Sequence, residues 1–241
     1  MRIVATSDTH GYQPPFSDWG EVIVIAGDLT AFGQREDLQK FSRWILREAK
    51  QRKAIVFVAG NHDWVFQSDT RAINSFKKLW AEAGNIHYLE DSGVEIDGVK
   101  FWGSPWTPMF YNWAFMRPDN ELQEIWAKIP ADTDVLITHG PPQGILDLTR
   151  RGSKAGSQTL WDRVREIEPK VHIFGHIHEA HGQVQQGRTR FYNVAFCDVD
   201  YAPVQPPVHI LLDTEKTTML PLSRGMTAYN IREYRDRMEK I

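Results

Sequence analysis

Five short blocks of the sequence contain side chains that bind metal ions in proteins. They are Asp8-Thr9-His10, Gly27-Asp28, Gly60-Asn61-His62-Asp63, His139-Gly140 and Gly175-His176-Ile177-His178. Imidazole, carboxylate and amide oxygen suit borderline or hard divalent ions such as Zn, Mn, Fe and Mg. So many side chains exceed the needs of one tetrahedral centre, but they suit two ions that share a carboxylate. We expect Asp28 to be the shared ligand, because an aspartate at a central strand end can reach both ions.

Each block has an ordinary explanation when it is taken alone. Asp-x-His arises by chance, Gly-Asp after a strand is often only a turn, and a single His-x-His pair is as often structural as ligating. Alternate residues of a strand end do point the same way, which favours His176 and His178 as a pair. Five such blocks at five separate strand ends indicate one shared site.

The segments before these blocks are short, apolar and rich in β-branched residues. Such nearly continuous runs are typical of strands that are buried on both faces. The runs are Ile3–Ala5, Val22–Ala26, Ile55–Ala59, Val135–Thr138 and Val171–Phe174. In open α/β sheets, ligands bind at the carboxyl ends of the strands, where several loops converge. The five blocks are therefore expected to meet at one edge of the sheet.

Helical patterns alternate with these strands. Apolar residues share one helix face in four stretches, which are 38–49, 72–83, 122–129 and 160–167. Gly84 stands where a helix C-terminal stop is expected. Strands that alternate with such helices indicate βαβ units and a largely parallel sheet.

Two stretches break this alternation and predict hairpins. Residues 94–101 contain an Asp-Gly turn between alternating residues, and residues 183–196 turn at Gly187 before a further strand at Val208–Leu212. The sheets are therefore expected to be mixed. The sequence shows no linker, and its 241 residues are compatible with one large domain.

The composition excludes several classes of protein. There are nine histidines but only one cysteine, Cys197, so an internal disulfide or a cysteine-based zinc site is excluded. The net charge of −3 and the pI of about 6.3 argue against a general nucleic-acid surface. No apolar run is long enough to span a membrane, and the N-terminus has no signal-peptide layout. We expect a cytoplasmic protein; its oligomeric state is not predicted.

The ordered set of blocks resembles the calcineurin-like metallophosphoesterase superfamily. Three further phrases, at 103–108, 138–142 and 174–179, resemble a narrower group, the metallophosphoesterase-domain-containing (MPPED-like) phosphodiesterases. The resemblance implies an α/β fold, a four-layer sandwich of two mixed β-sheets flanked by helices. It also implies a metallophosphoesterase domain over residues 1–222, followed by a charged C-terminal segment over 223–241, either a helix or a tail.

The resemblance also implies a role for each residue of the blocks. His62 would face the substrate and protonate the leaving oxygen, and Asp63 would hydrogen-bond His62 and fix its orientation. Two divalent ions, of Mn, Fe, Zn or Mg, would be the cofactors. The implied ligands are Asp8, His10 and His178 for the first ion, Asn61, His139 and His176 for the second, and Asp28 for both.

The expected function is hydrolysis of a small-molecule phosphodiester, with a cyclic nucleotide among the candidates, by a hydroxide that bridges the two ions. A phosphomonoesterase or a pyrophosphate-type hydrolase is the alternative within enzymes, since the same metal core would serve it. A metal-binding protein-interaction module is the alternative from another class. Metal-dependent turnover of aryl monoesters and diesters would distinguish the three.

Two further features suggest contacts with the substrate. The loop over residues 101–116 is crowded with aromatic residues, and Trp106 and Trp113 are candidates for stacking on a nucleobase or an aromatic leaving group. A hydrophobic cap over the core is the simpler explanation. Arg150 and Arg151 are candidates for an outer phosphate contact, against the alternative of a solvated basic loop.

Overall fold

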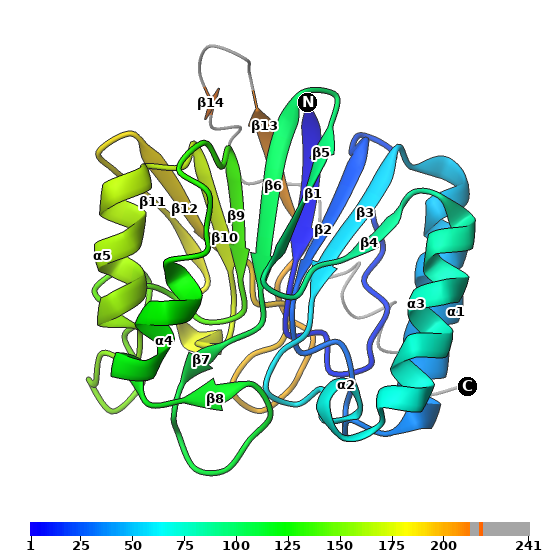
Figure 1. Ribbon diagram of the computed structural model, residues 1–241, viewed down its shortest axis with the longest axis horizontal. Helices are drawn as coiled ribbons and strands as arrows, with labels where there is room; N and C mark the ends of the chain where they lie inside the picture. The colour runs from blue at the N-terminus through cyan, green and yellow to red at the C-terminus, as the bar shows by residue number, and fades with distance from the viewer. Residues whose placement is uncertain (213–216, 219–241) are drawn as a thin grey trace.

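The computed structural model describes residues 1–212 and 217–218 and has four layers (Figure 1). Two six-stranded β-sheets pack face to face, and helices cover the outer face of each sheet. The predicted fold class, an α/β four-layer sandwich with two mixed sheets, is therefore confirmed. The boundary at residue 222 and the charged segment 223–241 lie outside the described residues.

The first sheet has the strand order β14-β13-β1-β2-β3-β4. β1 to β4 run parallel, and β13 pairs with β1 in the antiparallel sense. Every residue of β2 and β3 is buried, as predicted for central strands that are covered on both faces. The strands are β1 (Arg2–Thr6), β2 (Val22–Ala26), β3 (Ala54–Val58), β4 (Ile86–Tyr88), β13 (Val208–Leu212) and β14 (Thr217–Thr218).

The second sheet has the order β11-β12-β10-β9-β6-β5. Its four inner strands are parallel, and β5 and β11 close the two edges as antiparallel partners of β6 and β12. Both predicted hairpins are confirmed by these pairs. The strands are β5 (Ser92–Ile96), β6 (Val99–Ser104), β9 (Val135–Thr138), β10 (Val171–Phe174), β11 (Gly182–Gln186) and β12 (Thr189–Asn193). A separate small parallel pair, β7 (Thr107–Pro108) and β8 (Met116–Arg117), lies outside both sheets.

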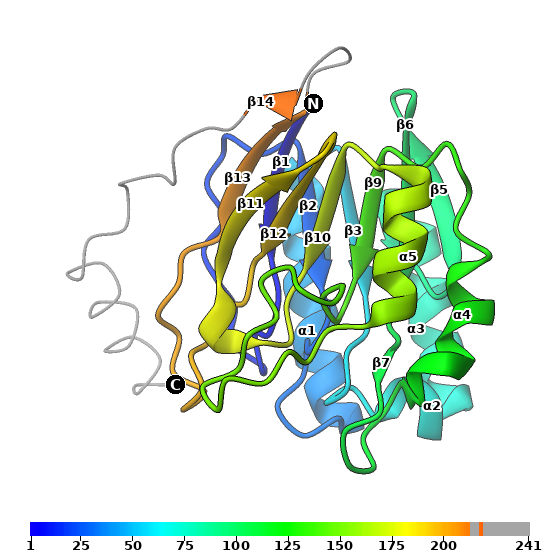
Figure 2. The same cartoon turned by 90° about the vertical axis from the view of Figure 1, so that its left-hand side faces the viewer.

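Helices α1 (Arg35–Glu48) and α3 (Thr70–Ala83) cover the first sheet, and α4 (Asp119–Trp126) and α5 (Gln158–Ile167) cover the second (Figure 2). The remaining helical turns are α2 (Val65–Ser68), η1 (Ala49–Gln51) and η2 (His178–Ala180).

The helix ends follow from local sequence. Gly84 ends α3 with a φ of +79°, as predicted, because glycine adopts the left-handed conformation without a Cβ clash. The predicted helix around residues 122–129 ends at Trp126, three residues earlier than Ile129. Pro130 follows and disfavours the helical conformation in the residue before it. Ile129 remains buried after the helix has ended.

The core has three parts because each buried strand presents alternate residues to opposite sides. In β2, Val22, Val24 and Ala26 pack between the two sheets, whereas Ile23 and Ile25 pack with the side chains of α1 and α3. A third apolar cluster lies between the second sheet and the helices α4 and α5. This packing fixes the two sheets relative to each other and brings the carboxyl ends of their strands to the same edge (Figure 1). Within the described residues, no helix is long and apolar enough to cross a bilayer.

Candidate metal centre

The five blocks of predicted metal ligands begin within two residues of the ends of β1, β2, β3, β9 and β10. The first three strands belong to one sheet and the last two to the other, so the blocks meet where the sheets face each other. Three groups of side chains place potential ligand atoms within 4.8 Å of one another. They are Asp8 with His10 and His178, Asp8 with Asp28 and His139, and His10 with Asp28 and His62.

Four of the predicted ligands have left-handed backbone conformations. The φ angle is +51° for Asp8, +44° for His10, +51° for Asp28 and +68° for His176. For residues other than glycine this conformation costs about 1–3 kcal/mol each and persists only where the surrounding structure demands it. The strain therefore accompanies the turn into the site after β1, β2 and β10.

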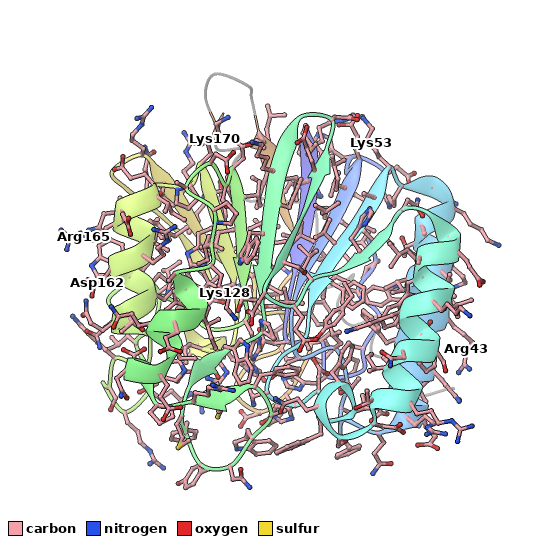
Figure 3. The ribbon with its side chains drawn as sticks, in the orientation of Figure 1. Arg43, Lys53, Lys128, Asp162, Arg165 and Lys170 are labelled. Atoms are coloured by element: carbon pink, nitrogen blue, oxygen red, sulfur yellow. The ribbon has the colours of Figure 1, made fainter. Side chains whose placement is uncertain are left out.

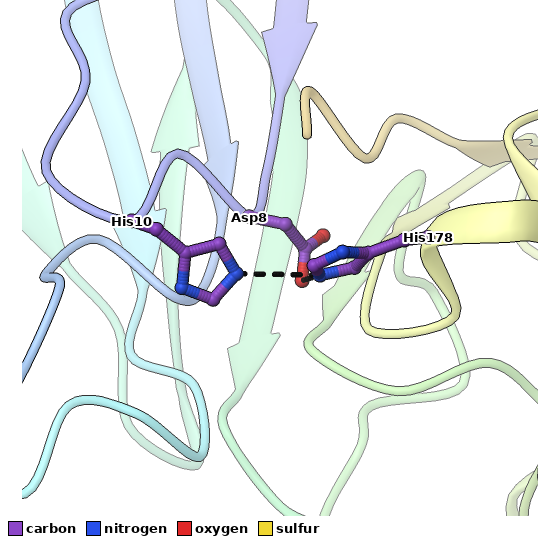
Figure 4. A group of neighbouring side chains, drawn as sticks. All are labelled: Asp8, His10 and His178. Carbon is purple, nitrogen blue, oxygen red and sulfur yellow. Dashed lines mark hydrogen bonds and ion pairs between the residues drawn. The ribbon is translucent and has the colours of Figure 1, made fainter. Parts of the chain in front are cut away.

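The first group contains Asp8, His10 and His178 (Figure 4). The Nε2 atoms of His10 and His178 lie 3.3 Å apart, and His178 Nε2 is also 3.3 Å from Asp8 Oδ1. The Asp8 carboxylate is held from behind, because Ser7 Oγ donates to its Oδ2 at 2.5 Å. The backbone N–H of His176 donates to both oxygens, at 3.1 and 3.0 Å. Three nitrogen and oxygen atoms therefore converge on one point.

Around Asp28 and His139 of another group, Asn61 and His176 add two further predicted ligands, and these four residues form the second cluster of the site. His139 Nε2 lies 2.8 Å from Asn61 Oδ1 and 3.4 Å from Asp28 Oδ1. The rings of His139 and His176 meet edge to face with centroids 5.0 Å apart. Asp28 Oδ2, the other oxygen of the same carboxylate, is 3.8 Å from His10 Nε2. Asp28 thus presents one oxygen to each cluster, which is an arrangement in which one carboxylate can serve two ions.

The tautomers of two histidines fit a bound cation. The backbone carbonyls of Ala26 and Asp198 accept from Nδ1 of His139 and His178, at 3.0 and 2.7 Å, so these nitrogens carry the protons. In each neutral ring the lone pair of Nε2 then points at carboxylate or amide oxygens, which are also acceptors. Such a contact is stable only with a positive charge present, either a proton on Nε2 or a metal ion. The donor set therefore fits divalent ions.

The pKa values show the same demand for positive charge. Burial lowers the pKa of His139, but the Asp28 carboxylate outweighs it and raises that pKa to about 9. For His178, burial is likewise outweighed by the hydrogen bond and charge of Asp8, and its pKa rises to about 9. Burial raises the pKa of Asp8, but His178 lowers it to about 2. The pKa of Asp28 falls well below its usual range against burial, chiefly because of His139. Without metal, imidazolium ions supply the charge that the carboxylates require.

The glycines of the blocks leave space for the ligands. A Cβ on Gly60 would lie 2.3 Å from Asp28 Oδ1, and one on Gly175 would lie 2.0 Å from Asp8 Oδ2. A Cβ on Gly27 would lie 2.4 Å from His139 Nδ1. All three distances are shorter than any real Cβ contact. The glycine in each of these blocks is thus explained by the approach of a side chain from a different strand.

Asp63 does not have the contact predicted for it. Its carboxylate accepts hydrogen bonds from the backbone of Leu29, Thr30 and Gly60 and from Thr30 Oγ1, at 2.6–3.1 Å. No hydrogen bond joins it to the His62 ring, so the interpretation that Asp63 orients this ring is corrected. The backbone turn places the carboxylate on the loop after β2. Asp63 fixes that loop, and with it Asp28, to the loop after β3.

His62 is oriented by other residues. Its ring stacks on Trp113 with centroids 4.7 Å apart and an interplanar angle of 26°, and it meets His10 edge to face at 4.6 Å. Tyr201 contacts the rings of both His10 and His62, with centroids at 4.7 and 5.8 Å. The backbone N–H of His62 also donates to Asp28 Oδ1 at 2.8 Å. Aromatic contacts therefore set the direction of the His62 ring.

Two clefts open on the site, and His62, Trp113 and Tyr201 line both of them. The metal-side cleft, of about 240 Å³, is also lined by Asp28, Asn61, His176 and His178. The aromatic cleft, of about 450 Å³, is lined on its other walls by His10, Tyr12, Ala31, Phe32 and Trp64.

The structure separates the predicted substrate residues. Trp113 lies at the site, whereas Trp106 lines neither cleft. Trp106 Nε1 donates to Asp91, and Arg117 lies over the Trp106 ring. These contacts fit the alternative explanation for Trp106, a hydrophobic cap over the core. The side chains of Arg150 and Arg151 line neither cleft.

Sequence reasoning missed Phe32 and Tyr201. They follow β2 and β12 in loops, and their types and spacing alone do not distinguish them from other exposed aromatic residues. Only the paths of these loops bring them to His62. Ser7, which donates to Asp8, was also missed, although it directly precedes the first block.

Comparisons with known proteins agree with this geometry. A family model described as calcineurin-like phosphoesterase matches residues 1–180. Metallophosphoesterase domain-containing protein 1 of Homo sapiens is 37% identical over 238 residues, which covers 90% of this chain and 72% of that protein. A UPF0046 protein of Caenorhabditis elegans is 39% identical over 208 residues, with 82% and 70% covered.

A solved structure that is 16% identical in sequence has a TM-score of 0.61 and covers 92% of this chain and 99% of its own. This likeness supports the fold alone. The family model and the two relatives confirm the resemblance read from the sequence blocks. The chain belongs to the calcineurin-like phosphoesterase family.

Proposed function

We propose that this protein is a dinuclear metal-dependent phosphodiesterase. The position of Asp28 carries the proposal, since its two oxygens face two separate groups of nitrogen and oxygen ligands. The first ion would be held by Asp8, His10 and His178, the second by Asn61, His139 and His176, and Asp28 would contact both. Two divalent ions bound there would supply positive charge for the phosphate oxygens and acidify water at neutral pH.

The charge of the metal-side cleft favours a diester over a monoester. Among its described lining residues there is no lysine or arginine, and Glu179 adds a carboxylate. A phosphomonoester dianion would need additional cations there, whereas a singly charged diester needs fewer. A phosphodiester, with cyclic nucleotides among the candidates, is therefore the proposed substrate class.

The reaction would consume one water molecule and release an alcohol and a phosphomonoester, or, from a cyclic diester, one phosphomonoester that carries the freed hydroxyl group. A P–O bond forms to the water oxygen, and the P–O bond to the alcohol breaks with its electron pair remaining on the alcohol oxygen. His62 would donate a proton to that oxygen, and the proton lost by water would restore His62. The stack on Trp113 and the contact with His10 hold the ring at the boundary of the two clefts for this step.

Replacement of His62 tests this assignment. We expect His62→Ala to lower kcat by about 10²–10⁴, the usual contribution of a positioned general acid, while the protein keeps its metal. Turnover of an aryl diester and of the matching aryl monoester is measured after loading with Mn, Fe, Zn or Mg, and bound metal is counted in the same samples. Asp28→Asn is the comparison, and it should lose metal.

Loss of bound metal in His62→Ala would show instead that His62 is a ligand, as its proximity to His10 and Asp28 allows. Faster turnover of the monoester than of the diester would contradict the proposed substrate class. The absence of metal-dependent hydrolysis with every ester and ion would contradict the proposed function itself.

A further inference from the structure

Large exposed apolar side chains gather on loops at the edge of the sheets that carries the predicted metal ligands, and four of them, Phe32, Phe110, Trp113 and Tyr201, line the two clefts. Most of those in the described part of the chain lie on the loops after β2, β7 and β12, and they are Phe32, Met109, Phe110, Tyr111, Trp113 and Tyr201. Of the charged residues that Figure 3 labels, Arg43, Asp162 and Arg165 lie on outer helices, and Lys53 and Lys170 lie at the edge of the sheets opposite the predicted metal ligands. Apolar groups that gather on an exposed surface mark a place where a ligand or partner binds.

The two clefts differ in chemistry. Predicted ligands of the two ions line the metal-side cleft, and these ions would in turn bind the phosphate group of the substrate. The aromatic cleft is nearly twice as large, about 450 against 240 Å³, and Tyr12, Phe32 and Trp64 line it beyond the shared residues. Seven of its eight lining residues carry an aromatic or imidazole ring, and the surface that they present to the cleft is mostly apolar. Such a cleft suits a planar apolar group and gives little support to a charged one.

The position of His62 between the two clefts indicates which part of a phosphodiester would lie in each cleft. It borders both, and its stack on Trp113 and edge contact with Tyr201 fix the ring between them. In an in-line displacement the leaving oxygen lies opposite the attacking one. If His62 protonates the leaving oxygen, the leaving alcohol lies on the side of His62 away from Asp28, Asn61 and His176. On that side His10 is the one predicted ligand among the residues that line the aromatic cleft.

We infer that the aromatic cleft binds the leaving alcohol of the substrate, and that this alcohol is aromatic or carries a planar ring. The phosphoryl group and the group that remains on it would occupy the metal-side cleft. This inference rests on the proposed function. It assigns specificity for the leaving group to Phe32 and Trp64, which line the aromatic cleft and not the metal-side cleft.

Matched changes at the two clefts test the orientation. Phe32 lines only the aromatic cleft and Phe110 lines only the metal-side cleft, and their exposed fractions are similar, 78% and 62%. The substrate is methyl 4-nitrophenyl phosphate, in which the leaving group is large and the remaining group is small. We expect Phe32→Ser to lower kcat/KM about tenfold, the size of effect that a lost apolar contact produces. Leu79→Ser, an exposed change on α3, should leave kcat/KM unchanged.

A second measurement does not depend on turnover. Saturation-transfer NMR detects weak binding of free 4-nitrophenol to the protein, and we expect its signal to weaken in Phe32→Ser and to persist in Leu79→Ser. A larger loss of kcat/KM in Phe110→Ser than in Phe32→Ser would reverse the orientation and overturn the inference. A phenol signal that is equal in Phe32→Ser and the unchanged protein would also overturn it.

These outcomes are separable from failure of the proposed function. If no diester is hydrolysed with any ion, the proposed function fails, and the NMR comparison still decides whether the cleft binds an aromatic alcohol. If diesters are hydrolysed but Phe32→Ser changes neither kcat/KM nor the phenol signal, only the assignment of the aromatic cleft is wrong.

Discussion

At the scale of single residues, Asp63 orders the centre without lying among its predicted ligands. Its buried carboxylate accepts from Leu29, Thr30 and Gly60, and these contacts hold the loop that carries Asp28 against the loop that carries Asn61. Burial and the nearby Asp28 charge raise the pKa of Asp63 to about 7, against the lowering effect of its donors. A carboxylate surrounded by donors in this way is replaced poorly by any other side chain.

We expect Asp63→Asn to lower the free energy of unfolding by about 2–3 kcal/mol. The new amide N–H₂ would face backbone N–H donors, so a buried donor would lose its acceptor. Thermal unfolding followed by circular dichroism measures the change. Asp18→Asn, at an exposed site, is the control and should be neutral. Equal stability of the two variants would contradict this account of Asp63.

The predictable part of the site is the part that follows from strand ends. Asp8 and Asn61 come within three residues of the ends of continuous apolar runs, so their convergence could be inferred from parallel-sheet geometry. The hydrogen-bond partners of Asp63 could not be inferred from the sequence. The direction of a side chain within a tight turn depends on backbone angles that the sequence does not show. Phe32 and Tyr201 were not predictable for a related reason, since loop paths depend on packing across the whole edge.

At the scale of elements, β10 carries a polar residue where an apolar one is usual. Val171 and Ile173 pack between the sheets, while His172 and Phe174 face the side of the second sheet that α5 covers. Nε2 of His172 lies 2.8 Å from Thr138 Oγ1, and Nδ1 of His172 has no hydrogen-bond partner. Burial therefore lowers the pKa of His172 to about 3.

This strand position predicts acid sensitivity. The unfolded chain binds a proton at His172 below its ordinary pKa of 6.5, and the folded protein does not until about pH 3. Stability is thus complete above pH 6.5 and declines as the pH falls toward 3. Between pH 7 and pH 5 the loss from this residue is about 2 kcal/mol. Urea unfolding at both pH values should show a smaller decline in His172→Leu, and equal declines would contradict the prediction.

The element boundaries were predictable where a local signal exists. Gly84 and the Asp97-Gly98 turn mark the end of α3 and the β5–β6 hairpin, because each requires a conformation that glycine favours. Two signals conflicted at the end of α4. Pro130 predicted an earlier end of the helix, whereas the apolar spacing predicted a helix up to Ile129. The small β7–β8 pair had none, since two-residue strands leave no periodicity.

At the scale of the whole molecule, the predicted metal ligands join the two sheets. His139 follows β9 of the second sheet and donates to the carbonyl of Ala26 in β2 of the first. The backbone of His176, after β10, donates to Asp8, after β1. Ions held by ligands from both sheets would therefore resist separation of the sheets as well as support chemistry.

We expect removal of divalent ions by a chelator to lower the unfolding temperature of the whole domain. At an ion concentration 100 times its Kd, bound metal adds about 2.7 kcal/mol to the free energy of unfolding. Differential scanning calorimetry with and without added ion measures the shift. Asp28→Asn should show a much smaller response. An unfolding temperature that is independent of metal in the unchanged protein would contradict this coupling of the sheets through the centre.

The carbonyls of Ala26 and Asp198 have a further consequence for loading. Because they keep the protons of His139 and His178 on Nδ1, protons and metal ions compete for the same two Nε2 lone pairs. The pKa values of about 9 mean that protons occupy both positions at neutral pH when metal is absent. Uptake of metal must then displace these protons into solution, so acidity of the medium acts as a competing ligand and sets how much metal the protein takes up.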